Sequence, residues 1–178
     1  MIKYRTLDDH DFSKDRVLLR LDLNLPTHNG TISDPTRLTK AIPTIARLAS
    51  RGAKVIIISH FGRPKGKSVR EMSMEKIFSS LCKALNGFTV KFIPHSIGSG
   101  VADDIRNMKN GEICLLENLR FHPGEEENDP EFSKSLALLG DCFVNDAFSV
   151  SHRAHASTAG IARLIPSFAG PLMDLELK

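Results

Sequence analysis

The stretch Val17-Leu-Leu-Arg-Leu-Asp-Leu-Asn24 decides the fold, because an apolar strand ends there and polar side chains follow at once. Short, nearly continuous aliphatic runs are typical of strands buried on both faces of a parallel sheet. The first run predicts a strand at Val17–Leu21. Runs of the same kind predict strands at Val55–Ser59, Val90–Ile93, Ile113–Leu116 and Cys142–Asn145.

Helical patterns fill the gaps between these runs. Asp34-Pro35 predicts a helix start, with Asp as the N-cap and Pro at the first helical position. Pro43 predicts a break there, followed by a second helix that ends before Gly52. Further helices are expected after Ser73, over Val101–Met108, and from Asp129-Pro130.

The alternation of strands and helices predicts the α/β class. We expect a doubly wound, mostly parallel sheet flanked by helices, of Rossmann-like type, in a single domain. Residues Pro171–Lys178 predict the start of one more helix, and we expect the natural polypeptide to continue beyond it.

The composition of the 178-residue chain is that of an ordinary folded domain, with 41% hydrophobic and 25% charged residues. The net charge of +3 suits an anionic ligand but is too small to indicate nucleic acid. The three cysteines form no Cys-x-x-Cys motif, which argues against a zinc site. We find no signal peptide and no membrane-spanning run, so the cytoplasm is favoured, although an imported protein that had lost its targeting segment would look similar.

Polar side chains follow the predicted strands in the same way each time. Ligands of open parallel sheets bind outside the carboxyl ends of the strands, so residues spread over ~130 positions would gather at one edge. Arginine there matches phosphate and carboxylate oxygens with its planar fork. The sequence therefore predicts a pocket for a small phosphorylated anion, with the candidates Asp22, Asn24, His60, Arg63, Arg120, His152, Arg153 and His155.

Each candidate also has a simpler local explanation. Arg63 begins a basic loop that solvent alone would account for, and Arg153 would equally suit a helix surface. Arg120 could pair with Glu117 or with Glu125–Glu127. Arg37 could pair with Asp34 in a capping turn, while Asp22 and Asn24 could brace the turn before Pro26.

Histidine leaves two further alternatives open. His60 could act as a general base or as a neutral donor to a ligand oxygen. His152 and His155 are three residues apart, yet no Cys or acid is placed with them, so a metal site is weakly supported. The chain has neither a G-x-x-x-x-G-K-[ST] loop nor a G-x-G-x-x-G helix opening, and no G-x-S-x-G elbow.

Four extended motifs resemble those of the phosphoglycerate kinase family, in the family's order. They are Arg20-Leu-Asp22-Leu-Asn24-Leu-Pro26, Ser59 to Gly66, Leu115 to Phe121 followed by His122-Pro-Gly-Glu-Glu, and Val144 to His155. The resemblance is to the N-terminal domain, which binds 3-phosphoglycerate, and it runs from the first strand to the last residues. Two positions depart from the family pattern: Leu23 replaces the usual Phe, and Ser149 replaces a Gly, which would strain the loop if that position needed a positive φ.

The resemblance implies a role for each matched residue. Asp22 and Asn24 would hold the glycerate hydroxyl end, and Arg37 would face the carboxyl or acyl-phosphate group as the catalytic residue. The 3-phosphate would be bound by His60, Arg63, Arg120 and Arg153. The family's substrate-binding segments add Leu23, Phe61 and Gly62.

The resemblance also implies an enzyme class and partners. The family's reaction is the reversible glycolytic transfer of a phosphoryl group between 1,3-bisphosphoglycerate and ADP, which gives 3-phosphoglycerate and ATP. The phosphoryl acceptor in the reverse direction is a carboxyl group. Residues 1–170 would form the substrate domain and 171–178 the start of the interdomain helix. Mg-ATP or Mg-ADP would bind to the C-terminal domain, which this chain lacks, so we expect a cytoplasmic monomer that holds no metal and is inactive alone.

Two rival functions remain at this point. A stand-alone phosphate-binding module would share the same residues but would need no second domain. A nucleic-acid binder would lose affinity steeply with salt and would not be displaced by 3-phosphoglycerate.

Overall fold

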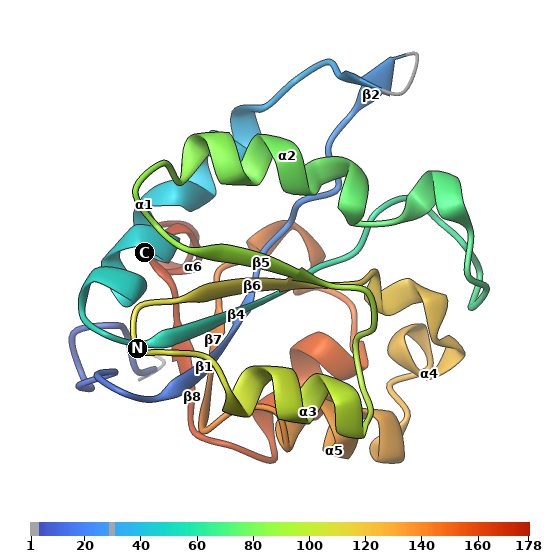
Figure 1. Ribbon diagram of the computed structural model, residues 1–178. Helices are drawn as coiled ribbons and strands as arrows, with labels where there is room; N and C mark the ends of the chain where they lie inside the picture. The colour runs from blue at the N-terminus through green and yellow to red at the C-terminus, as the bar shows by residue number, and fades with distance from the viewer. Residues whose placement is uncertain (1–3, 29–30) are drawn as a thin grey trace.

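The computed structural model describes residues 4–28 and 31–178 and contains a six-stranded parallel sheet between two layers of helices (Figure 1). The strands are β1 (Arg16–Arg20), β4 (Lys54–Ile58), β5 (Val90–Ile93), β6 (Ile113–Leu116), β7 (Cys142–Asn145) and β8 (Ser167–Ala169). Their order across the sheet is β5-β6-β4-β1-β7-β8. The predicted α/β class, the doubly wound parallel sheet and the single domain are confirmed.

Burial on both faces explains why the strand sequences are so uniformly apolar. In β1, Val17 and Leu19 pack into one core and Leu18 packs into the other. The first core lies under α1 (Thr36–Ser50) and α2 (Glu75–Ala84), and the second lies under α3 (Ser99–Arg106) and α5 (Pro130–Ala137). Figure 1 shows these two pairs of helices on opposite sides of the sheet.

Two predictions for the first helix are wrong. The N-cap of α1 is Pro35 and not Asp34, and the helix begins at Thr36. Helix α1 runs without a break through Pro43, which cannot donate the backbone bond that would reach the carbonyl of Thr39. Ala41, Ile45 and Leu48 lie on either side of the proline along the helix and are all buried in the same core. Packing on the sheet therefore keeps both halves helical despite the missing hydrogen bond.

Several smaller elements complete the chain. The sequence did not predict strand β8 or the antiparallel pair β2 (Thr27–His28) and β3 (Thr31–Ile32). Asp129 caps α5 as predicted, since its side chain accepts from the backbone N–H of Phe132. The remaining helical segments are η1 (Arg70–Met72), η2 (Leu119–Phe121), α4 (Pro123–Glu126), η3 (Phe148–Val150), η4 (Ala156–Gly160) and α6 (Pro171–Leu177).

The strand order creates a crevice at the carboxyl edge of the sheet. β4 and β7 pair with opposite sides of β1, so the chain leaves β1 in one direction and later returns on the other. The loops that follow these strands consequently diverge around the end of β1. Such a switch point is where ligands of open α/β sheets bind.

Candidate functional site

The segment after β1 holds a carboxylate in a dense set of hydrogen bonds. The Oδ2 atom of Asp22 lies 3.0 Å from Nη1 of Arg37 and also accepts the Ser149 hydroxyl at 2.5 Å. Its Oδ1 atom accepts the backbone N–H of Asn24 at 3.2 Å. Asp22 therefore braces its own turn, as the local explanation allowed, and also ties β1 to α1 and η3.

Arg37 reaches across this turn from the first turn of α1. Its Nη1 donates to the backbone carbonyl of Asn24 at 3.0 Å, and half of its side chain is exposed. The ion pair found for Arg37 is with Asp22, whereas Asp34 accepts the N–H of Thr36. The guanidinium is thus held beside the crevice on a side chain that is half exposed.

The loop after β4 approaches the loop after β1 through a glycine. The N–H of Gly62 donates to Oδ1 of Asn24 at 2.9 Å, and its carbonyl accepts Nη1 of Arg120 at 3.1 Å. Gly62 has φ +64°, and a Cβ atom there would lie 2.9 Å from the sulfur of Met72. The positive φ favours glycine at this point, and the Met72 side chain would have to shift to admit a Cβ atom.

The loop after β6 is organised by Asn118, which the sequence did not single out. Its side-chain amide donates to the carbonyls of Phe61 and Met72, both at 2.7 Å. Its Oδ1 atom accepts the N–H groups of Phe61 and Arg120. One buried amide therefore sets the positions of the loops that carry His60, Arg63 and Arg120.

Arg120 is almost wholly buried, at 5% exposure, and its Nε has no hydrogen-bond partner among the described residues. The nearest carboxylate oxygen, on Glu126, is 3.5 Å away, so the ion pair expected with a nearby glutamate forms only loosely. Burial is the main cause that lowers the pKa of Arg120. The carboxylates of Glu126 and Glu125 oppose this effect, and the charges of Arg153 and Arg63 add to it. The charges of Arg153 and Arg63 thus act unfavourably on the buried guanidinium of Arg120, and a bound anion would relieve that repulsion.

His60 lies behind this group and is buried, at 3% exposure. Burial, followed by the charges of Arg20 and Arg120, lowers the pKa of His60 to about 2. The imidazole is therefore uncharged at neutral pH. Of the two alternatives left open for His60, a group that stays neutral fits a hydrogen-bond donor better than a base that must take up a proton.

Arg153 follows η3 and lies ahead of the helical segment that begins at Ala156. Its Nε is 3.2 Å from Nε2 of His152, and the side chain is exposed. The buried ring of His155 precedes the same segment, 4.0 Å from the carboxylate of Glu125. In the part of the chain that the structure describes, no group of three or more His, Cys, Asp or Glu residues is arranged to hold a metal ion.

Two of the predicted site residues contribute only backbone groups to the site. The side chains of Leu23 and Phe61 are buried in the core, so only their backbone groups reach the loops. Ser149 has no positive φ, because it lies in η3, and the strain considered for this departure does not arise.

The structure thus gathers the following predicted residues around one crevice: Asp22, Asn24, Arg37, His60, Gly62, Arg63, Arg120 and Arg153.

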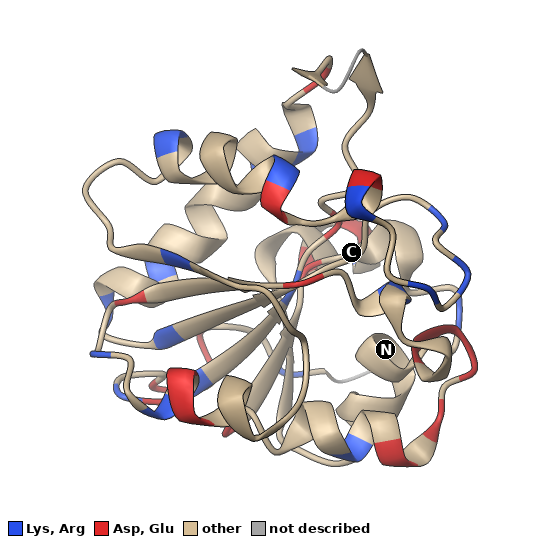
Figure 2. Cartoon of the chain, turned by 45° about the vertical axis from the view of Figure 1, so that its right-hand side comes forward, with Lys and Arg blue, Asp and Glu red and all other residues tan. Residues whose placement is uncertain are grey.

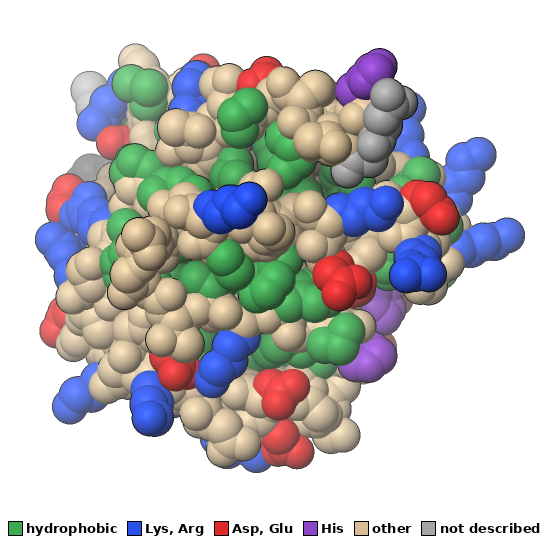
Figure 3. Space-filling model, turned by 45° about the horizontal axis from the view of Figure 1, so that its top comes forward, with side chains coloured by type: hydrophobic (Ala, Val, Ile, Leu, Met, Phe, Trp, Pro, Cys, Tyr) green, Lys and Arg blue, Asp and Glu red, His purple; other side chains and the backbone are tan. Residues whose placement is uncertain are grey.

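The charge distribution agrees with this arrangement. Figure 2 shows Lys and Arg positions along the loops at the carboxyl ends of the strands, which come forward in that view. On the face covered by α1 and α2, Figure 3 shows basic side chains at separate places, with others projecting at the right-hand margin.

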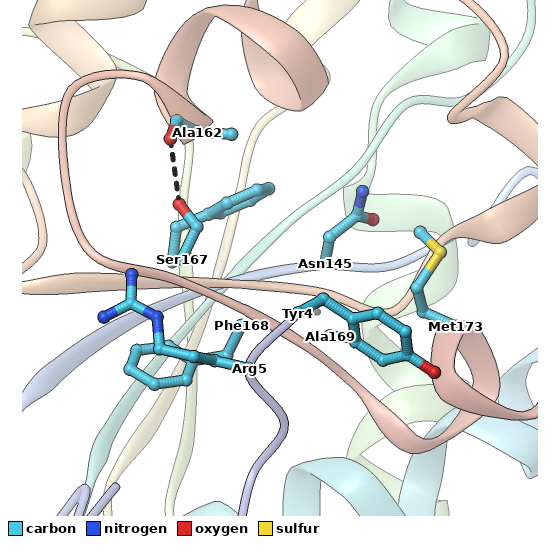
Figure 4. Close-up of a pocket in the computed structure, with 9 residues that line it drawn as sticks. Tyr4, Arg5, Asn145, Ala162, Ser167, Phe168, Ala169 and Met173 are labelled. Atoms are coloured by element: carbon cyan, nitrogen blue, oxygen red, sulfur yellow. Dashed lines mark hydrogen bonds between the residues drawn. The ribbon is translucent and has the colours of Figure 1, made fainter. Parts of the chain in front are cut away.

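Two hollows lie beside the sheet. One, of about 340 Å³, borders the crevice and is lined in part by Asp22, Arg37, Lys40 and Ser149. The other, of about 420 Å³, lies beside β8, and none of the predicted site residues lines it (Figure 4). Its lining residues are Tyr4, Arg5, Phe143, Asn145, Ala162, Ser167, Phe168, Ala169 and Met173.

Comparison with known proteins agrees with the predicted family. The model of the family described as phosphoglycerate kinase matches residues 7–178. The chain belongs to the phosphoglycerate kinase family. Curated relatives named phosphoglycerate kinase include one from Cereibacter sphaeroides, 50% identical over 98% of this chain, and one from Agrobacterium fabrum, 49% identical over 100% of it.

Solved structures of phosphoglycerate kinases have the same fold. The structure from Coxiella burnetii is 38% identical over 98% of this chain, with a TM-score of 0.88. That from Pyrococcus horikoshii is 35% identical over 97% of it, with a TM-score of 0.87. The chain spans only 44% of the length of the two curated relatives, and 43% and 44% of the two solved chains. In the described residues, no helix has both the length and the apolar character needed to cross a membrane.

Proposed function

We propose that this chain is the 3-phosphoglycerate-binding part of a phosphoglycerate kinase. The observation that carries the proposal is the convergence of Arg63, Arg120 and Arg153, with the buried Nε of Arg120 left without a hydrogen-bond partner among the described residues. Three arginine side chains at one edge of the sheet suit a phosphate dianion, because each guanidinium can donate to its oxygens. Residues 1–170 would form the substrate domain, and 171–178 would begin the helix to a second domain.

The proposed roles follow the positions of the side chains. His60, Arg63, Arg120 and Arg153 bind the 3-phosphate. Asp22 and Asn24 hold the hydroxyl end of the glycerate, next to the partly exposed guanidinium of Arg37. Arg37 is the catalytic residue, because it can stabilise the charge that develops on the transferring phosphoryl group.

The reaction we propose for the complete protein is the glycolytic transfer between 1,3-bisphosphoglycerate and ADP. Its reverse uses the carboxyl group of 3-phosphoglycerate as the acceptor. Phosphoryl transfer depends mainly on positioning and charge stabilisation, and the crevice offers both for one of the two substrates. We assign Mg-ATP and Mg-ADP to a second domain outside this chain, and we propose a cytoplasmic monomer that does not catalyse the reaction without that domain.

Calorimetric titration of the chain with 3-phosphoglycerate tests the proposal. Arg63→Ala should weaken binding by about 1.5–3 kcal/mol, roughly 10- to 150-fold, which is typical of a hydrogen bond to a charged group. Arg106→Ala is the matched control, because it removes the same charge from α3, where Arg106 is exposed and pairs with Asp103.

Two results of the titration would contradict the proposal, one for the role of Arg63 and one for the function of the whole chain. Equal affinity in Arg63→Ala, Arg106→Ala and the unchanged chain would remove Arg63 from the pocket. No binding by the unchanged chain, at concentrations that saturate phosphoglycerate kinases, would refute the proposed function itself.

A further inference from the structure

Arg20, the last residue of β1, is a buried cation that no role proposed above uses. It is only 1% exposed although it ends the strand at the centre of the crevice. A charge that has left water needs partners for its donors and a counter-charge. The identity of those partners shows what Arg20 does.

A short chain of buried groups supplies the counter-charge. Nε of Arg20 donates to the hydroxyl of Ser157 at 2.9 Å. That hydroxyl donates to one oxygen of Glu125 at 2.5 Å, and the N–H of Ser157 donates to the other at 3.0 Å. Glu125 is 0% exposed, so its carboxylate is sealed in the same interior and opposes the effect of burial on the pKa of Arg20.

The remaining donors of Arg20 point toward the site. Nη1 donates to the backbone carbonyl of Leu21, and Nη2 lies 3.0 Å from Nδ1 of His60. A guanidinium has five N–H donors, no acceptor, and stays protonated in proteins. For this contact to be a hydrogen bond, Nδ1 of His60 must therefore be the acceptor and carry no proton.

A neutral imidazole has one ring proton, so the proton excluded from Nδ1 must be on Nε2. None of the described residues accepts a hydrogen bond from Nε2, and this atom is not sealed from solvent. Protonation of both nitrogens would place an N–H against the N–H of Arg20 and would add a charge beside four neighbours. These neighbours are Arg20 on β1, Arg37 on α1, Arg120 on η2 and His155 ahead of η4.

We propose that Arg20 is a positioning residue that holds the buried, neutral His60 in the Nε2–H form, so that this N–H can donate to a phosphate oxygen in the crevice. The assignment of the tautomer depends only on contacts in the structure, whereas its role in binding phosphate rests on the proposed function. Because Arg20 keeps its charge at any physiological pH, His60 keeps the same donor from about pH 5 upward. The hydrogen bond from His60 to the ligand would then not depend on its own titration, which separates it from a histidine that binds phosphate as a cation.

Nuclear magnetic resonance of the ¹⁵N-labelled chain without ligand tests the tautomer. Long-range ¹H–¹⁵N correlations distinguish a protonated from an unprotonated ring nitrogen, and His60 is assigned by the signals missing from His60→Gln. We expect a protonated Nε2, an unprotonated Nδ1, and no change between pH 8 and pH 5. A protonated Nδ1, an averaged mixture of tautomers, or an imidazolium formed near pH 6.5 would overturn the proposal.

The role of Arg20 is tested in the unchanged chain and in a variant. A scalar coupling across the Nη2–H···Nδ1 bond is expected in the unchanged chain, and its absence with both groups observed would overturn the assignment to Arg20. Arg20→Met should release the tautomer, so that the proton of His60 is shared between Nδ1 and Nε2. Arg16→Met removes the same charge from the other end of β1, where Arg16 pairs with Asp141, and should leave the His60 signals unchanged.

Binding measurements distinguish a failure of the role proposed for Arg20 from a failure of the proposed function. If the chain fails to bind 3-phosphoglycerate but shows the Nε2–H tautomer and the coupling, the proposed function fails and the positioning role stands. If it binds but His60 carries its proton on Nδ1, the inference fails alone. An Arg20→Met chain that folds, by circular dichroism, with an unchanged His60 spectrum would also overturn it.

Discussion

The burial of His60 predicts that the free energy of unfolding falls as the solution is acidified. Burial, with the charges of Arg20 and Arg120, lowers the pKa of His60 to about 2 in the folded chain, against an ordinary value of about 6.5. Between these values the unfolded chain binds a proton that the folded chain does not. The stabilisation from a neutral His60 is therefore complete above about pH 6.5 and is lost progressively as the pH falls toward 2.

The size of the effect follows from this difference in proton binding. From pH 7 to pH 5 the folded ring stays unprotonated while the unfolded ring becomes almost fully charged. One such group changes the free energy of unfolding by about 2 kcal/mol over this interval. Burial also lowers the pKa of His122 and His155, so these rings add to the loss in the same direction.

Urea unfolding followed by circular dichroism at pH 7, 6 and 5 measures the slope. His60→Gln should reduce the loss between pH 7 and pH 5 by about 2 kcal/mol, whatever its effect at a single pH. His28→Gln is the control, because His28 is exposed on β2 and its removal leaves the crevice intact. A pH slope in His60→Gln equal to that of the unchanged chain would refute the reasoning, because His60 would then titrate alike in both states.

Two further predictions concern the reaction. In a protein extended to the full length of its relatives, Arg37→Ala should lower kcat by up to roughly a thousandfold with a smaller change in KM, and a raised KM with unchanged kcat would show that Arg37 only binds the ground state. The 178-residue chain alone should fold, as judged by far-UV circular dichroism, but should make no ATP from 1,3-bisphosphoglycerate and ADP in a coupled assay, since it would not align the second substrate. Turnover by a contaminant-free preparation, or a spectrum of a disordered chain, would contradict that expectation.

Local patterns predicted the strands because these segments are buried on both faces, which demands an unbroken apolar sequence. Strands β5, β6 and β7 have the bounds that the sequence predicted, and β1 and β4 differ by one residue at each end. Strand β8 has three residues, too few to show any periodicity, and was missed. The break expected at Pro43 was wrong, because local propensity was outweighed by the burial of Ala41, Ile45 and Leu48 against the sheet.

The candidate site could be predicted in outline because parallel strands bring their carboxyl ends to one edge. That rule brings together residues as distant as Asp22 and Arg153, whatever the path of the loops between them. The rule does not specify which side chains form ion pairs or hydrogen bonds with one another. Arg37 forms an ion pair with Asp22 and not with the neighbouring Asp34. The hydroxyl of Ser149, 127 residues away in the sequence, donates a hydrogen bond to the carboxylate of Asp22.

The sequence by itself determined the strand positions, the edge at which the polar residues gather, and the family resemblance, because each depends on residue type and order along the chain. Only the tertiary structure decided the charge state of His60, the counter-charge of Arg20 and the organising role of Asn118. These properties depend on burial and on contacts between groups 32 to 137 residues apart, such as Ser157 with Glu125 and Arg20 with Ser157. Desolvation and hydrogen-bond geometry exist only once the chain has folded, so no local pattern could have shown them.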